Sequence, residues 1–531
     1  MECLRGLFDS DANELPNRMW AHDTSVWQRQ GREASAIKER LGWLAAPSRV
    51  ADSIDEYLSF VEEICSAGYT KVVVLGMGGS SLFAEFVRKC WGSREGYLDL
   101  LVLDSTMPSA ISRLVESLDL KKTLFLVSSK SGTTTEALAF FSLFYDLIYE
   151  FLGDEAGQSF VAITDPNTPL VALAKEYGFR RVFYADPFVG GRYSAFTPFG
   201  MLPAALAGLD ICRLVCHAVE TAESCRNISD PAANPGISLG IKLGNSYLNG
   251  RDKLTLLCSP SISSFGLWLE QLVAESTGKD GEGMLPIIEE PVCGPGKYGQ
   301  DRVFVVLRLS GDNNNVIDKQ ASDLIQEGHE VIEISIGNKY ELGSELYRWM
   351  FATSTLGAVM RIDPFDQPNV QESKDNTEDI LAAFARGEGI PSIGPKESIE
   401  NILSEIKEGQ YLAIMAYVGF SSEVDAALKA LREVLCEKYS LTTTIGYGPR
   451  FLHSTGQLHK GGRNIGHFLQ ICEKGADLPI PGRPYGFAML AEAQSIGDYQ
   501  ALKTRGFQVA RIDIEADADT ADAISAITSA I

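Results

Sequence analysis

The chain has 531 residues, of which 45% are hydrophobic and 22% charged. This composition is typical of a folded globular protein and argues against a disordered, collagen-like or membrane protein. Lys and Arg number 47 against 70 Asp and Glu, and the formal charge of −23 argues against nucleic acid or a membrane surface as a partner. An anionic substrate would have to be held by a few local cations and backbone N–H groups in a cleft.

We expect a cytoplasmic protein. No apolar run reaches the ~18 to 20 residues that a spanning helix needs. The first ten residues lack the basic-then-apolar order of a signal peptide. Ten cysteines are scattered from Cys3 to Cys472 without a Cys-x-x-Cys pair, which favours reduced, buried thiols over disulfides or zinc.

The first part of the chain predicts a helical arm followed by a parallel sheet. Residues 1–45 contain three tryptophans within polar sequence and are interpreted as an arm packed on the body. A helical pattern at 54–67 follows. Strands that are apolar throughout then alternate with helical patterns, which indicates a parallel sheet covered on both faces. These strands are expected at 71–75, 100–103, 124–127, 160–164 and 181–184.

An internal repeat indicates that this α/β unit is duplicated. The strand at 71–75, with its Gly/Ser loop, resembles residues 253–257 at an offset of 182. The strand at 124–127, followed by Ser-Gly, resembles residues 303–306 at an offset of 179. Only the first copy keeps the small hydroxyl side chains and the lysine in its loops. We therefore expect any phosphate-binding loops in the first copy.

A Gly/Pro-rich stretch at 387–395 marks a boundary before a third, smaller α/β domain. The predicted fold class is α/β, with two duplicated parallel-sheet sandwich domains at 46–225 and 226–385 and the third domain at 396–531. Its strands are expected at 412–418, 442–445, 467–471 and 509–514.

The sequence GMGGSS at 76–81 follows a strand and opens a helix. Its glycines would let backbone N–H groups approach an anion at the positive end of the helix, so one interpretation is a phosphate cradle. A dinucleotide site is the rival, with Asp104 as the ribose acceptor, but Ser81 stands where that fingerprint needs its third glycine. A merely structural tight turn is also possible.

A second loop, SSKSGTTT at 128–135, again lies between a strand and a helix. Six of its eight residues carry hydroxyls and one carries an ammonium group. Hydroxyls, helix N-terminal amides and a cation together suit a phosphate dianion, whereas a helix cap alone would explain one hydroxyl.

These loops and three further segments resemble the phosphoglucose isomerase family. SSKSGTTTE after GMGGSS resembles the phosphate loop of sugar isomerases, and motifs in the family's order extend the likeness over about residues 50 to 375. The further segments are GGRYS at 190–194, QLVAESTGK at 271–279 and FDQPNVQESK at 365–374. The arm and the C-terminal part resemble the isomerase half of fused transaldolase/phosphoglucose isomerase proteins. The fold that this likeness implies is a pair of sugar-isomerase (SIS) type domains.

The resemblance implies a catalytic role for Glu275. Gln271 and Glu275 are four residues apart on a predicted helix, so their side chains share a face. A carboxylate there could take a proton from C2 of an opened sugar and return it to C1, through an enediol(ate). The family assigns this role to the matching glutamate.

Two cations complete the implied machinery. Arg192 follows two glycines, and its charge could stabilise the enediolate oxygen, although a structural ion pair is the alternative. The family uses the lysine that matches Lys374 to assist ring opening, and it places the match of Gln367 in the active site.

The resemblance does not identify the residue that acts as the acid in opening the sugar ring. The family takes it from a histidine reached across a dimer, but this sequence has Asp301 at that position. Three of the six histidines lie at 453, 459 and 467 around the Gly-rich segment 454–462. Our hypothesis is that this loop docks over the cleft and that His459, ahead of His453, supplies the acid. A histidine serving only local hydrogen bonds is the alternative.

We therefore expect a glucose-6-phosphate isomerase that interconverts glucose 6-phosphate and fructose 6-phosphate, with no cofactor and no metal. Activity on mannose 6-phosphate, a non-catalytic sugar-phosphate regulator and a nucleotide-dependent oxidoreductase remain alternatives. A homodimer is possible, but a third domain covering the cleft could make a monomer sufficient. The phosphate is expected to bind at Gly79, Ser80, Ser129, Lys130, Ser131 and Thr134.

Overall fold

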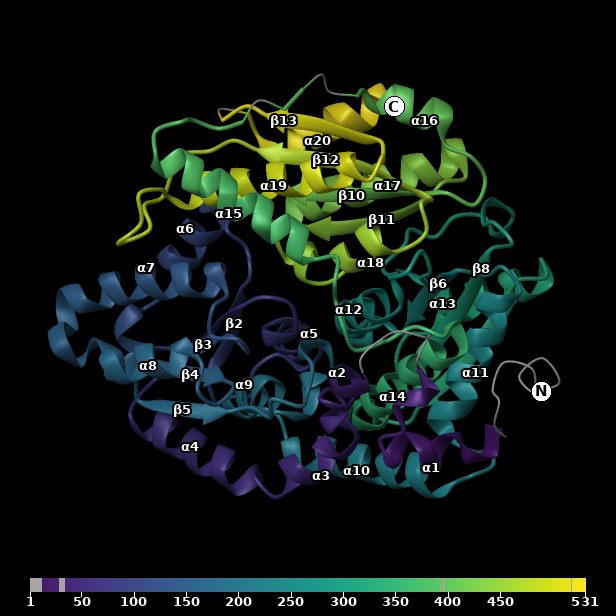
Figure 1. Cartoon of the computed structure of the whole chain (residues 1–531), viewed down its shortest axis with the longest axis horizontal. Coiled ribbons are helices and arrows are strands. Elements are labelled where there is room, and N and C mark those ends of the chain that lie inside the picture. Colours follow the sequence, from purple (N-terminus) through teal and green to yellow (C-terminus); the bar gives the residue numbers. More distant parts are fainter. Residues whose placement is uncertain (1–11, 28–33, 392, 395–396, 517) are drawn as a thin grey trace.

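The computed structural model describes residues 12–27, 34–391, 393–394, 397–516 and 518–531, and these residues form three parallel sheets (Figure 1). The first sheet has the strand order β2-β1-β3-β4-β5. Every predicted strand of this region is present within one residue of its expected bounds, and the α/β fold class is confirmed. The strands are β1 (Lys71–Gly76), β2 (Asp99–Leu103), β3 (Thr123–Ser128), β4 (Phe160–Thr164) and β5 (Arg181–Tyr184).

Both faces of this sheet are buried, which explains why its central strands are apolar throughout. Val72 and Val74 of β1 pack in one hydrophobic core, whereas Val73 and Leu75 pack in another on the opposite face. Alternate side chains of a strand point to opposite faces, so a strand covered twice needs apolar residues at every position. The helices of this unit are α4 (Ile54–Ser66), α5 (Leu82–Trp91), α6 (Pro108–Ser117), α7 (Thr135–Leu152), α8 (Pro169–Glu176), α9 (Pro198–Leu206) and α10 (Ile211–Asn227).

The second sheet repeats the first in its topology. Its order, β7-β6-β8-β9, matches β2-β1-β3-β4, so the duplication seen in the sequence is present in the fold. Two of its strands were not predicted from the sequence. One has only three residues, and the other carries Glu330 and Glu333, whose polarity suits an edge strand. The strands are β6 (Lys253–Cys258), β7 (Leu285–Ile287), β8 (Arg302–Leu309) and β9 (Glu330–Ile336).

Four helices pack around the second sheet: α11 (Pro235–Leu248), α12 (Phe265–Thr277), α13 (Asn315–Gln326) and α14 (Leu342–Met360). Helix α15 (Gln371–Ala385) follows in the chain but packs in the core of the first sheet, through Ile380 and Leu381. The described part of the arm holds α1 (Leu15–Trp20), α2 (Ala34–Lys38) and α3 (Ala46–Ala51). Trp27 and Trp43 are buried, and Trp43 stacks on Tyr193 with 5.1 Å between the ring centroids. The arm therefore packs on the body and supports the residue next to Arg192.

A third sheet, of order β11-β10-β12-β13, forms what we call the C-terminal unit, from α16 to α20. It lies above the other two sheets in Figure 1. All four predicted strands are present. The elements are α16 (Ile399–Glu405), β10 (Tyr411–Tyr417), α17 (Ser422–Tyr439), β11 (Thr442–Tyr447), α18 (Gly456–Gly461), β12 (Gly466–Glu473), α19 (Phe487–Thr504), β13 (Val509–Ile514) and α20 (Thr520–Ala530).

The C-terminal unit is docked closely on both other sheets. At Gly278, directly after α12, a Cβ atom would lie 2.2 Å from the Cα of Leu458 in α18, so only glycine allows this backbone contact. On the first sheet, Arg450 binds the carboxylate of Asp104 through Nε and Nη2, both at 2.8 Å. The segment between β11 and α18 is thus fixed against the edge where strands β1 and β3 end.

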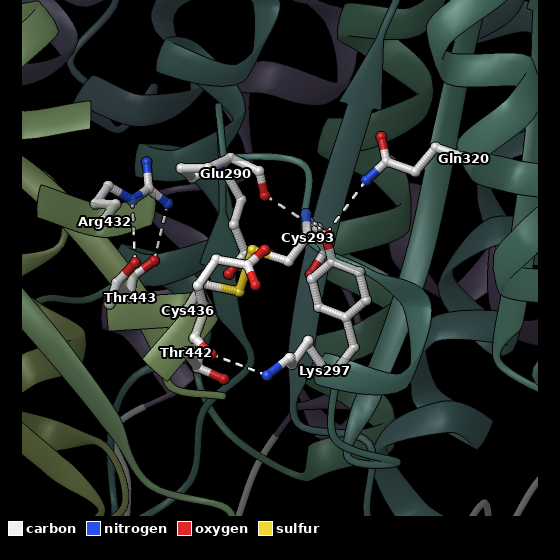
Figure 2. Close-up of a disulfide and its surroundings, with 12 residues drawn as sticks. Glu290, Cys293, Lys297, Gln320, Arg432, Cys436, Thr442 and Thr443 are labelled. Atoms are coloured by element: carbon white, nitrogen blue, oxygen red, sulfur yellow. Dashed lines mark hydrogen bonds between the residues drawn. A yellow bond between two sulfur atoms is a disulfide. The ribbon is translucent and has the colours of Figure 1, made fainter. Parts of the chain in front are cut away.

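A disulfide between Cys293 and Cys436 joins the second sheet to the C-terminal unit (Figure 2). The two Cα atoms are 6.7 Å apart, and the residues are 143 positions apart in the chain. Nearby, Arg432 on α17 donates to the carbonyl of Glu289 at 3.0 Å. This bond corrects the expectation of reduced thiols, because a pairing between two distant units leaves no spacing signal in the sequence. Of the remaining described cysteines, Cys90, Cys225 and Cys472 are buried, whereas Cys212 and Cys216 are exposed; Cys3 lies outside the described residues.

Across the described ranges, none of the helices is both long enough and apolar enough to cross a membrane.

Candidate active site

A cavity of about 680 Å³ lies where the first sheet, α12, α15 and the C-terminal unit meet. All predicted site residues line it except Ser129 and His459. The predicted residues that line the cavity come from segments up to 295 positions apart, from Gly79 to Lys374. The residues are Gly79, Ser80, Lys130, Ser131, Thr134, Arg192, Gln271, Glu275, Gln367 and Lys374.

The first loop, after β1, lies directly against the GGRYS segment. A Cβ on Gly79 would lie only 2.1 Å from the carbonyl oxygen of Gly191, so the two backbones can meet only through glycine. Ser80 ends a short 3-10 helix (Gly78–Ser80) and is half-buried at the cavity wall. This contact places the small side chain of Ser80 and the guanidinium of Arg192 around one space.

The second loop, between β3 and α7, presents Ser131 and Thr134 to the cavity. Ser129 does not face it, because its side chain is buried and builds the loop. Its Oγ is 2.8 Å from Oγ1 of Thr134 and accepts from the backbone N–H of Gly132 at 3.1 Å. Ser129 therefore fixes the positions of the hydroxyls that do line the cavity.

The ammonium group of Lys130 is turned toward the protein. It pairs with the carboxylate of Asp165 and donates to the carbonyl of Pro187 at 3.2 Å. Burial lowers the pKa of Lys130, and the neighbouring Asp165 opposes that shift. Lys130 thus joins the second loop to the segment that leads into GGRYS.

Glu275 and Gln271 lie on the same face of α12, as the spacing predicts. Gln271 Nε2 donates to Glu275 Oε2 at 2.9 Å, and its Oε1 has no hydrogen-bond partner among the described residues. Arg192 Nη1 lies 3.4 Å from Glu275 Oε1. Both carboxylate oxygens are therefore oriented.

Arg192 is buried and held by several acceptors. Its Nη2 donates to the carbonyls of Pro364 at 2.7 Å and Asp366 at 2.9 Å, and its Nε donates to Ser276 Oγ at 2.8 Å. Nη1 also reaches Gln367 Oε1 at 3.4 Å. The guanidinium is thereby fixed beside Glu275 with one nitrogen at the cavity, which suits a fixed charge rather than a mobile one.

Lys279, next to this cluster, was not singled out in the sequence analysis. Its ammonium is fully buried and binds Asp366 Oδ1 at 2.8 Å. Burial lowers the pKa of Lys279 to about 8. It fixes the loop that carries Gln367.

The structure does not bring His459 to the cavity. His459 is buried inside the C-terminal unit, where its Nδ1 lies 3.0 Å from the hydroxyl of Tyr411 and its ring packs against Phe468. Burial lowers the pKa of His459 to about 3, so the ring stays neutral near pH 7. Asp301 is also absent from the cavity lining, because Lys253 binds its carboxylate at 2.6 Å.

The segment between β11 and α18 instead presents His453 to the cavity. Its backbone carbonyl accepts from Gln271 Nε2 at 2.9 Å, and its Nε2 lies 3.0 Å from Oε1 of Glu136. Burial alone would raise the pKa of Glu136, but the adjacent His453 holds it below its ordinary value. A carboxylate only accepts, so Nε2 carries the hydrogen and Nδ1 is the ring nitrogen left to exchange a proton.

The pairing of Glu136 with His453 could not be predicted from the sequence, where His453 was the second candidate for the acid after His459. Glu136 directly follows the second loop and ends its SSKSGTTTE motif. Its partnership with a residue 317 positions away is a result of domain docking. The predicted arm also contributes Glu39 and Arg40 to the lining, a role that its polar composition did not indicate.

The structure argues against a dinucleotide site, because the carboxylate that would accept the ribose hydroxyl is already bonded. Asp104, which would have bound a ribose, is 3% exposed and is occupied by Arg450 through both carboxylate oxygens. In the part of the chain that the structure describes, no cluster of three or more His, Cys, Asp or Glu side chains could hold a metal ion. The absence of a metal requirement remains a prediction.

Comparisons with known proteins agree with this geometry. Residues 45–287 match the family model described as phosphoglucose isomerase. A glucose-6-phosphate isomerase of Leptospira interrogans is 28% identical over 383 residues, covering 64% of this chain and 86% of the relative. One from Mycoplasmopsis pulmonis is 27% identical over 389 residues, covering 65% and 90%.

Two solved structures share the fold. A hypothetical protein of Thermus thermophilus superposes with a TM-score of 0.59 at 24% identity, covering 70% of this chain and 94% of that one. A glucose-6-phosphate isomerase of Chlamydia trachomatis superposes with a TM-score of 0.55 at 18% identity, covering 73% and 87%.

The duplicated parallel sheets, with hydroxyl-rich loops at the cavity, have the α/β fold of these two solved structures. Within that fold, residues 45–287 match the family model of phosphoglucose isomerase. The resemblance to phosphoglucose isomerases is therefore confirmed, whereas the likeness of the arm and the C-terminal part to fused proteins stays a prediction.

Proposed function

We propose that this protein is an aldose-ketose isomerase that interconverts glucose 6-phosphate and fructose 6-phosphate through an enediol(ate). One observation carries the proposal: the hydroxyl loops of the first sheet and the carboxylate of Glu275 line the same cavity, with Arg192 beside the carboxylate. The relatives named glucose-6-phosphate isomerase support the choice of substrate.

The phosphate is bound by the two loops of the first sheet. Ser80, Ser131 and Thr134 offer hydroxyls, and the N-terminus of α7 offers backbone N–H groups and a positive dipole end. Lys130 keeps the second loop in place through Asp165 and adds a nearby positive charge. Anchoring one end of the sugar chain in this way positions C1 and C2 for reaction.

Ring opening needs an acid at the ring oxygen and a group that takes the proton of the C1 or C2 hydroxyl. His453 and Lys374 line the cavity from different elements and are the candidates for these roles. In this assignment the acid is His453, on the C-terminal unit of the same chain, instead of the predicted His459. A single protomer would then carry a complete site.

Proton transfer follows on the open chain. Glu275 takes the C2 proton and returns it to C1, while Arg192 stabilises the negative charge on the enediolate oxygen. Gln271 keeps Glu275 Oε2 oriented. The charge of Arg192 is present before the reaction begins, so no reorganisation is needed when charge develops.

The proposal is tested with Glu275→Gln and a matched control, Glu270→Gln, because Glu270 is a buried glutamate of the same helix that does not line the cavity. The wild-type protein and the control should convert fructose 6-phosphate in a coupled assay. They should also exchange the C2 proton of glucose 6-phosphate with solvent deuterium, in the presence of a chelator. Glu275→Gln should still show a thermal shift with fructose 6-phosphate but lose exchange by about 10² to 10⁴-fold.

Turnover by Glu275→Gln at the wild-type rate would refute the role of Glu275. A wild-type protein stabilised by NAD but not by sugar phosphates would refute the isomerase itself. A parallel assay with mannose 6-phosphate shows whether the enzyme is selective for the configuration at C2.

A further inference from the structure

Gln494 lies on α19 of the C-terminal unit but bonds to the first sheet. Its side chain is 4% exposed. Helix α19 packs against α15, which carries Lys374, and the two helices lie side by side in Figure 1. Gln494 also borders a second cavity, of about 540 Å³, which shares Lys374 and His453 with the first. The residue is therefore close to the site without lining the first cavity.

Two hydrogen bonds fix the orientation of its amide. Thr106, a fully buried residue after β2, donates its hydroxyl to Gln494 Oε1 at 2.8 Å. Gln494 Nε2 donates to Glu136 Oε1 at 2.6 Å. A carboxylate can only accept, so the NH₂ group must face Glu136 and the oxygen must face Thr106.

Oε1 of Glu136, which accepts the hydrogen bond from Gln494, also bonds to His453. Glu136 Oε1 lies 3.0 Å from His453 Nε2 and 2.6 Å from Gln494 Nε2. The C-terminal unit thus contacts one carboxylate oxygen twice, from the segment before α18 and from α19. Glu136 itself sits in the first turn of α7, directly after the phosphate loop.

We propose that Gln494 is a positioning residue for ring opening: it holds the Glu136 carboxylate in the orientation that directs Nδ1 of His453 toward the sugar ring oxygen. This inference rests on the proposed function, and it gives the C-terminal unit a second task beyond supplying His453. Gln494 does not touch the substrate. It acts through Glu136, and Thr106 ties it to the first sheet.

Loss of the Gln494 donor should slow one step only. Glu136 would keep its bond to His453 but could rotate, so the imidazole would spend less time aligned with the ring oxygen. Glu275, Arg192 and the phosphate loops would be unchanged. Ring opening should slow, while sugar-phosphate binding and C2 proton transfer on the open chain remain as before.

Gln494→Met tests this, because methionine has a similar length and no donor. Enzyme-catalysed exchange between the α and β anomers of glucose 6-phosphate, followed by NMR, reports ring opening. We expect this exchange to fall at least tenfold, with KM for fructose 6-phosphate within twofold of wild type. The primary isotope effect of C2-deuterated glucose 6-phosphate on turnover should shrink, because ring opening becomes limiting.

Gln470→Met is the matched control. Gln470 is a buried glutamine of the same unit that donates to the carbonyl of Ser495 at 3.1 Å and lines neither cavity. This variant should keep wild-type anomer exchange and isotope effect. Should Gln494→Met not fold, Thr106→Val removes the hydroxyl that orients the amide, and it should lower anomer exchange without changing KM.

A folded Gln494→Met with wild-type anomer exchange and isotope effect overturns the inference, as does an equal loss in Gln470→Met. If Gln494→Met does not fold, wild-type anomer exchange in Thr106→Val overturns it. Failure of the proposed function is distinguishable, because the wild-type protein would then catalyse neither anomer exchange nor isomerisation.

Discussion

Replacing Arg192 by lysine tests whether a fixed guanidinium, rather than a positive charge alone, serves the reaction. Arg192 donates to Ser276, Pro364 and Asp366 at 2.7 to 2.9 Å while a further nitrogen stays 3.4 Å from Glu275. A lysine ammonium has three donors on a flexible stem and cannot serve all these acceptors at once. We expect the lysine ammonium to bind the carbonyls of Pro364 and Asp366 and to lose its contact with the Glu275 carboxylate.

The expected loss can be estimated from that geometry. Removing one preorganised donor from a developing oxyanion lowers kcat by about 10² to 10³-fold, or about 2.7 to 4 kcal/mol. Each buried carbonyl that loses its donor lowers the free energy of unfolding by about 1 to 3 kcal/mol. Affinity for the phosphate should change little, because the loops of the first sheet hold that group.

The assay is steady-state conversion of fructose 6-phosphate, with stability followed by denaturant unfolding. The control is Arg308→Lys, which makes the same exchange of arginine for lysine away from the cavity. Arg308 is a half-exposed residue of β8 that pairs with Asp318. A kcat for Arg192→Lys above one tenth of wild type would refute the reasoning. So would a rise in KM that accounts for the whole effect.

Three other predictions concern His459, Glu270 and the disulfide. His459→Gln should leave anomer exchange within about twofold, whereas His453→Gln should lower it by about 10² to 10⁴-fold, as expected for loss of a general acid; the reverse order would restore His459 to the site. Burial raises the pKa of Glu270 from 4.5 to about 8, so the folded state binds a proton between these pH values that the unfolded state lacks. Stability contributed by this group is present below pH 4.5 and is lost as pH rises to 8. Glu270→Gln should therefore raise Tm at pH 8 and leave it unchanged near pH 4.5, and parallel Tm profiles for the two proteins would contradict this. Cys436→Ser should lower the free energy of unfolding by about 2 to 5 kcal/mol, and a reductant should lower the Tm of the wild type but not of the variant; insensitivity of the wild type to reductant would argue against the bond.

Local sequence was enough for most of the fold. The β1 strand is apolar from Val72 to Leu75 because both of its faces are covered, and such apolar runs between helical patterns indicated a parallel sheet. Loops whose chemistry is carried by nearby residues, such as Gly79 with Ser80 and Ser131 with Thr134, could also be identified from the sequence, and they line the cavity. Strand β7 escaped because three residues give too short a pattern.

What the sequence by itself determined is therefore whatever short-range periodicity and composition encode: the α/β class, the duplication, the two loops and the pairing of Gln271 with Glu275 on one helix turn. The tertiary structure alone decided which histidine reaches the cavity, which way the Lys130 ammonium turns and which two cysteines bond. Each of these depends on the docking of segments 35 to 317 positions apart. Such contacts are set by the packing of whole sheets and helices, and a residue's sequence neighbours carry no record of them.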